Sequence, residues 1–99
     1  MAQFDVHPLR SRQSLVIDCQ SDLHRDLPTR FVVPLVPLTD PSASHASLAP
    51  RFVIDGKEWV MATHFAATLP LRDLGPAIAS LSGESHRVIG AIDALVTGI

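Results

Sequence analysis

Short apolar segments dominate the first two thirds of the chain. Residues 3–7 alternate between apolar and polar positions, which predicts a half-exposed strand with His7 on its polar face. Residues 15–19 form an apolar, β-branched run that only Asp18 interrupts. This composition is typical of a central strand of a sheet.

Prolines and a glycine mark the next apolar segments. Residues 31–38 are apolar, but Pro34 and Pro37 have no N–H to donate to a neighbouring strand. We therefore expect an edge strand here, or one that ends in an irregular bend. Residues 51–61 predict two strands around Asp55-Gly56, because this dipeptide tolerates the positive φ of a tight hairpin turn.

Loops and short elements fill the remaining sequence before the last segment. Residues 20–30 and 39–50 are rich in polar residues and proline, and they predict loops. Residues 67–71 predict another short strand, and residues 77–81 predict a helical turn.

Residues 83–99 change to a helical period. Apolar residues recur at i, i+4, i+7 and i+11, which predicts an amphipathic helix. They are Val88, Ile92, Leu95 and Ile99. Ser82 is the expected N-cap, and Glu84 suits the positive end of the helix dipole. The chain is thus predicted to be one mainly β domain over residues 1–99, a twisted antiparallel sheet of about five to seven short strands with one C-terminal helix.

Composition narrows the class of protein. The 99 residues suffice for one domain, and 46% apolar against 18% charged residues excludes a disordered chain. The net charge of −2, without a strongly basic segment, argues against direct nucleic-acid binding. No apolar run is long enough to span a membrane, and the N-terminal segment does not resemble a signal peptide. A single cysteine, Cys19, then favours a reducing, cytoplasmic location.

The residue pattern contains no recognisable catalytic or metal-binding motif. The five histidines are scattered without paired ligand spacing, so we expect neither a metal site nor a cofactor. Cys19 lies in an apolar strand, where a free cysteine behaves as a small buried hydrophobe. Trp59, the only tryptophan, is expected to anchor the core or an interface.

Several segments in combination resemble the CcdB family, the toxins of plasmid and chromosomal toxin–antitoxin systems that serve plasmid maintenance. The segments are Gln3-Phe4, residues 17–23, residues 30–35, residues 53–61, residues 67–70 and Gly98-Ile99. The resemblance implies a small SH3-like barrel with a C-terminal helix that pairs as a homodimer. Because the apolar helical stripe continues to residue 99, we expect the dimer axis to pass near the C-terminal helices. The resemblance also implies a protein that is not an enzyme. It binds the A subunit of DNA gyrase, traps the enzyme on cleaved DNA, and is neutralised by the disordered C-terminal segment of a CcdA-like antitoxin.

The resemblance also assigns residues to two sites. The gyrase-binding tip falls on Thr97, Gly98 and Ile99, with Thr97 in the place of a tryptophan that can stack on an arginine of the target. The antitoxin-binding positions are Gln3, Phe4, His7, Ser21, Leu23, His24, Asp93 and Val96.

Two other functions remain open at the level of sequence. One is an endoribonuclease toxin of the MazF type on the same barrel, for which Arg30, Asp26 and Thr29 are the loop residues that could supply acid–base groups. The other is a CcdB homologue that does not poison gyrase and binds only its antitoxin.

Overall fold

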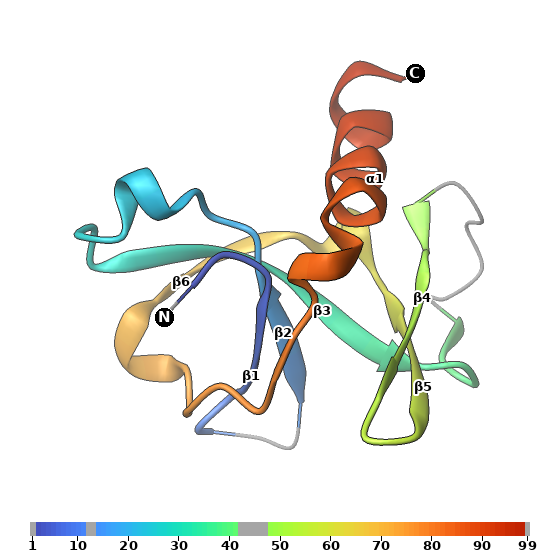
Figure 1. The fold of residues 1–99 in the computed structure, drawn as a ribbon, viewed down its shortest axis with the longest axis horizontal. Helices are drawn as coiled ribbons and strands as arrows, with labels where there is room; N and C mark the ends of the chain where they lie inside the picture. Colours follow the sequence, from blue (N-terminus) through green and yellow to red (C-terminus); the bar gives the residue numbers. More distant parts are fainter. Residues whose placement is uncertain (1, 12–13, 42–47, 99) are drawn as a thin grey trace.

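The computed structural model describes residues 2–11, 14–41 and 48–98. Within these ranges the chain forms seven strands, one α-helix and several single turns of 3-10 helix (Figure 1). The strands are β1 (Asp5–Pro8), β2 (Leu15–Asp18), β3 (Thr29–Pro37), β4 (Arg51–Ile54), β5 (Lys57–Met61), β6 (Ala67–Pro70) and β7 (Ala79–Ser80). The 3-10 turns are η1 (Asp22–His24), η4 (Thr63–Phe65), η5 (Leu71–Asp73) and η6 (Ser82–Glu84), and the helix is α1 (Ser85–Thr97).

The strands form a single antiparallel, barrel-like sheet in the order β4-β5-β3-β2-β1-β7. The long strand β3 organises it, because β2 pairs along one side of β3 while β6 and β5 pair in turn along the other side. Figure 1 shows β3 running across the molecule below α1. The mainly β prediction with one C-terminal helix is confirmed.

The prediction of an edge strand at residues 31–38 is wrong, since β3 is the most central strand. Pro34 is tolerated there because it lies between the residues that pair with β6 and those that pair with β5. Its carbonyl accepts a hydrogen bond from Ala62 N–H at 2.9 Å. The N and O atoms of one strand residue point to the same side, so the N–H that proline lacks would face this junction rather than the β2 ladder.

The central part of the sheet is buried on both faces. The main core lies between the sheet and α1, and it is built from the buried side chains Val6, Ile17, Cys19, Val33, Leu35, Phe52, Ile54, Met61, Leu81, Val88 and Ala91. A smaller core of Val16, Val32 and Leu74 covers the opposite face of β2 and β3. The half-exposed strand expected over residues 3–7 is therefore wrong for β1, where Val6 and His7 are both buried.

The hairpin and the central strand at residues 15–19 agree with the sequence predictions. Asp55 and Gly56 have φ values of 52° and 76°, which are the left-handed conformations that a two-residue hairpin turn requires. Trp59 in β5 is half-buried against the main core. The ammonium group of Lys57 lies 4.6 Å from the centroid of its ring.

Residues 77–81 do not form the predicted helical turn. Ala79 and Ser80 pair with β1 instead, and the N–H groups of Ile78 and Leu81 donate to backbone carbonyls of the N-terminal segment at 2.9 and 2.8 Å. Pairing with a strand far away in the sequence outweighs the local helical preference.

The helix begins later than predicted. Ser82 starts the 3-10 turn η6 rather than capping α1, and Glu84 precedes α1 without a side-chain cap. Glu84 accepts instead from the guanidinium of Arg87 at 2.7 Å, and Arg87 also donates to the carbonyl of Arg51 at 2.7 Å. These contacts attach the first turn of α1 to β4.

Only the first half of the helical stripe is buried. Val88 and Ala91 are buried against the sheet, whereas Leu95 and Val96 are exposed. Figure 1 shows the reason, because the last turns of α1 extend beyond the sheet. Ile99, the last member of the predicted stripe, lies outside the described residues.

Candidate functional site

The N-terminal segment meets η1 through side-chain hydrogen bonds. Gln3 donates from Nε2 to the carbonyl of Cys19 at 3.1 Å, and its backbone N–H donates to Asp22 Oδ1 at 2.8 Å. Ser21 is the N-cap of η1, and its hydroxyl accepts from the N–H of Leu23 at 3.2 Å. These bonds bring together three of the expected antitoxin-binding residues, Gln3, Ser21 and Leu23. Leu23 is 87% exposed.

Phe4 and His24 are the other two expected antitoxin-binding residues in this region, and they differ in exposure. Phe4 has a φ of 72°, which is uncommon for a residue other than glycine. Its backbone bonds to Asp18 and Leu81 hold this conformation, and its ring is half-buried against the main core. His24 is exposed at the end of η1, and its carbonyl accepts from the side chain of Gln20 at 2.8 Å.

His7 lies elsewhere, because it is only 1% exposed. Its Nδ1 lies 2.8 Å from the carbonyl of Gly75, so Nδ1 carries the proton that it donates. Its Nε2 is buried without a hydrogen-bond partner among the described residues. In this structure His7 is not on the surface that carries Leu23 and His24, so a partner cannot touch it there.

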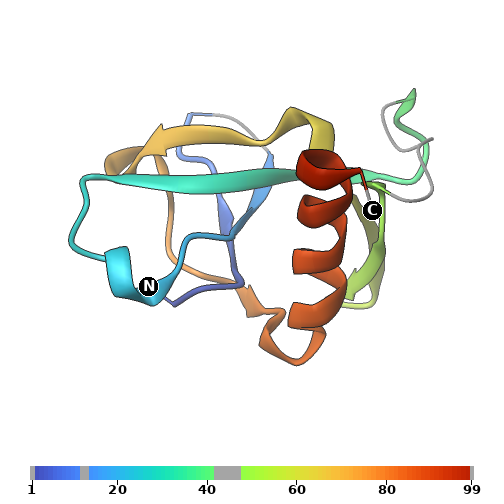
Figure 2. The ribbon, with the colours of Figure 1, turned by 90° about the horizontal axis from the view of Figure 1, so that it is seen from above.

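Asp93 and Val96 lie on the exposed side of α1. In Figures 1 and 2, α1 and η1 occupy different ends of the sheet, so the structure does not bring these two residues into contact with Ser21 and Leu23. Val96 is 75% exposed. Apart from His7, the expected antitoxin-binding residues therefore form two separate groups, one at η1 and one on the helix.

The end of α1 is closed by backbone and side-chain bonds. Gly98 has a φ of 76° and donates its N–H to the carbonyl of Ala94 at 3.0 Å, as expected for a left-handed helix cap. The hydroxyl of Thr97 donates to the carbonyl of Asp93 at 2.6 Å. Thr97 and Gly98 are both exposed, while the third expected gyrase-binding residue, Ile99, lies outside the described residues.

A buried ion pair lies beneath η1 and was not predicted as part of the site. Arg30 is 4% exposed, and its Nε lies 3.5 Å from Asp18 Oδ2. Burial raises the pKa of the Asp18 carboxyl above its ordinary value of 3.8, although a hydrogen bond from Gln20 and the charge of Arg30 act in the opposite direction. The signal in the sequence was the acidic residue within the apolar run 15–19.

The residues considered for an endoribonuclease do not form an accessible acid–base group. The guanidinium of Arg30 donates to three backbone carbonyls and is buried. Asp26 is exposed in the loop, and Thr29 is half-buried at the start of β3. An arginine that is buried and bonded to these carbonyls cannot contact RNA in this conformation.

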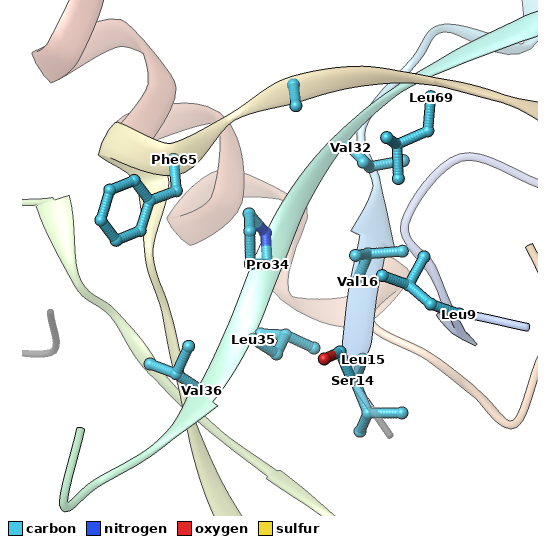
Figure 3. Close-up of a pocket in the computed structure, with 11 residues that line it drawn as sticks. Leu9, Ser14, Leu15, Val16, Val32, Pro34, Leu35, Val36, Phe65 and Leu69 are labelled. Carbon is cyan, nitrogen blue, oxygen red and sulfur yellow. The ribbon is translucent and has the colours of Figure 1, made fainter. Parts of the chain in front are cut away.

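An open, apolar cavity of about 260 Å³ lies over β2, β3 and β6 (Figure 3). The residues that line it are Leu9, Ser14, Leu15, Val16, Val32, Pro34, Leu35, Val36, Phe65, Ala67 and Leu69. None of their side chains is titratable, so the cavity can contact apolar groups but offers no acid or base.

Comparison with known families gives a match that covers nearly the whole chain. The family model described as CcdB protein matches residues 3–98. In the described part of the chain, no helix has the length and apolar character needed to cross a membrane.

Proposed function

The chain belongs to the CcdB family and is thus a toxin of a toxin–antitoxin system, and from this premise we propose that it binds the A subunit of DNA gyrase. The proposed contact is the end of α1, with Thr97, Gly98 and Ile99 as the binding residues. Gyrase is trapped on cleaved DNA, and the toxin itself performs no covalent chemistry. This proposed target places the protein in the cytoplasm.

The observation that supports this proposal most directly is the projection of α1 beyond the sheet (Figure 1). Gly98 ends the helix in a left-handed conformation, and the exposed Leu95 and Val96 lie just before it. An exposed apolar end on a rigid helix can enter a hollow in a partner without rearrangement of the barrel.

Thr97 is the weakest part of the proposed contact. Its hydroxyl proton is already donated to the carbonyl of Asp93, so the side chain offers a partner only a methyl group and an acceptor oxygen. Stacking of an aromatic ring on an arginine is worth about 0.5–2 kcal/mol, and threonine cannot supply it. This observation favours the second candidate function, a homologue that binds its antitoxin without poisoning gyrase.

A gyrase-mediated DNA cleavage assay separates the two functions. A variant that ends at Thr97 should lose trapping of cleaved DNA, whereas Thr97→Trp should equal or exceed the wild type. Ile78→Ala is the matched control, because Ile78 is also an exposed apolar residue but lies in the segment before β7. Trapping by the shortened variant would show that the end of α1 is not the contact.

We also propose that a CcdA-like antitoxin neutralises the protein with a disordered segment. The η1 group (Gln3, Phe4, Ser21, Leu23 and His24) and the helix group (Asp93 and Val96) are its binding residues. A long segment that folds on binding can reach both groups although they lie apart. Calorimetry with the purified antitoxin should show tight binding that Leu23→Ala weakens, and equal affinity of Leu23→Ala and wild type would contradict this assignment.

A further inference from the structure

The loop between β2 and β3 has almost no apolar anchor of its own. Residues 22–28 are all exposed, and η1 contains no buried residue. Leu23 is the most exposed large apolar side chain of the described residues. Hydrophobic packing therefore cannot hold the shape of this loop, and hydrogen bonds must do so.

Arg30 supplies these bonds at the end of the loop. Its Nη1 donates to the carbonyls of Leu27 and Thr29 at 3.0 Å each, and its Nη2 donates to the carbonyl of Arg25 at 2.7 Å. A planar guanidinium has five N–H donors in a fixed geometry. One buried side chain thus binds the backbone of the loop at three positions.

Asp18 connects Arg30 with the beginning of the loop. Its Oδ2 faces Arg30 Nε at 3.5 Å, and its Oδ1 accepts from the N–H of Gln20 at 3.0 Å. The side chain of Gln20 adds a second link, because it accepts from Phe31 N–H at 3.0 Å and donates to the carbonyl of His24 at 2.8 Å. Both ends of the loop are therefore tied to β2 and β3.

We propose that Arg30, held by Asp18, is a positioning residue for antitoxin binding, because it keeps residues 20–28 in the shape that presents Leu23. The inference rests on the proposed function, in which Leu23 contacts the antitoxin segment. A disordered partner must lose conformational freedom when it binds, and a preformed loop avoids a second loss on the side of the toxin.

The decisive variant is Arg30→Lys. Lysine keeps a positive charge beside Asp18, but a single ammonium group cannot reach the three carbonyls that the guanidinium binds. The probe is the full-length CcdA-like antitoxin, and both affinity and association rate are measured. We expect the affinity to fall roughly ten- to hundred-fold, the loss typical for hydrogen bonds to a charged group. Much of this fall in affinity should appear as slower association, because a smaller fraction of the molecules has the loop in the conformation that binds the antitoxin.

Hydrogen exchange distinguishes a local effect on the loop from a general loss of stability. In Arg30→Lys, the amides of residues 23–27 should exchange faster, whereas those of β5 and α1 should keep their protection. Arg51→Lys is the matched control, since Arg51 is an exposed arginine on β4, and it should change neither exchange in the loop nor affinity.

Each outcome decides the inference. Unchanged affinity of Arg30→Lys overturns it, whether or not the loop exchanges faster. If Arg30→Lys fails to fold, Asp18→Asn tests the same link, because the amide keeps an oxygen acceptor for Gln20 N–H but removes the charge that faces Arg30. This variant must accelerate exchange in the loop and weaken binding. Failure of the wild type to bind the antitoxin overturns the proposed function itself, which distinguishes that result from failure of the inference alone.

Discussion

At the scale of single residues, the barrel contains polar and charged side chains that are buried. Asp18 and Arg30 form an ion pair that is almost completely removed from solvent. Such a pair gives little net stability compared with apolar side chains, but the loss of one partner leaves a buried charge uncompensated. We therefore attribute the role of this pair to the shape in which it holds residues 20–28, and not to a gain in net stability.

Cys19 gives a prediction at the scale of a single thiol. Burial, with a smaller contribution from the charge of Asp18, raises the pKa of the Cys19 thiol from 9.0 to about 12. At pH 8 the native thiolate fraction is then roughly one in ten thousand. We expect a thiol-specific reagent to modify the native protein at least about a hundredfold more slowly than the protein unfolded in guanidinium.

The same shift predicts a pH dependence of stability. The unfolded thiol ionises near pH 9 and the native thiol near pH 12, so the unfolded state binds fewer protons between these values. The free energy of unfolding should therefore decrease as the pH rises from about 9 to 12. Cys19→Ala should reduce this decrease, and rapid modification of native Cys19 at pH 8 would contradict the assigned burial.

At the scale of elements, β3 and α1 determine how the sheet and the main core are arranged. Strand β3 pairs with three neighbours, and the junction between two of them accommodates Pro34. Helix α1 packs on the main core only through its first turns, and its last turns remain free of the sheet. The helix is thus both a lid of the core and a projecting element.

Gly90 gives a prediction for the helix. It lies in the interior of α1, and a Cβ atom added there would meet no atom within 4 Å. Gly90→Ala should stabilise the protein by about 0.5–1 kcal/mol, because glycine loses more conformational freedom in a helix than alanine. Thermal unfolding followed by circular dichroism should show an increase of a few degrees in Tm, roughly as expected for a domain of this size.

Gly56→Ala is the matched control for this experiment. The space around Gly56 is equally open, but its φ is +76°, a conformation in which a Cβ atom causes strain. It should lower the Tm. A lower Tm for Gly90→Ala would show that α1 does not tolerate an ordinary helical residue at this position.

At the scale of the whole molecule, the exposed apolar residues at the end of α1 are relevant to the pairing of two copies of the chain. Leu95 and Val96 project from the barrel, and Phe65 of the neighbouring η4 is also exposed. A chain of this size has a small core, and apolar residues gathered at one place often mark an interface. This arrangement supports the proposal of a homodimer that forms near the C-terminal helices.

Sedimentation equilibrium tests the homodimer. The wild type should sediment at micromolar concentration with twice the chain mass of 10.7 kDa. Leu95→Glu should shift it toward the monomer, because a carboxylate would have to be buried in the interface. Ile78→Glu changes a residue of similar exposure away from the helix and should leave the dimer intact, so a wild-type monomer would remove this part of the proposal.

Local chemistry allowed the sequence alone to determine several elements. The hairpin follows from the turn preference of Asp55-Gly56, the strand at residues 15–19 from its β-branched run, and the helix from its 3.6-residue period. The segments quoted for the CcdB resemblance spanned the chain, and the family match over residues 3–98 confirmed it. The hairpin, the strand and the helix depend on residues that are close together in the sequence.

Tertiary structure alone decided the features that depend on distant partners. Pro34 is central because β5 ends and β6 begins beside it. His7 is buried because it pairs with Val16 of the second small core and because the segment at Gly75 lies against its ring. Residues 79–80 are a strand because β1 offers them hydrogen bonds. Arg30 holds the loop because the fold places three backbone carbonyls around one guanidinium. In each case the deciding energy comes from contacts between segments whose proximity no local sequence pattern encodes.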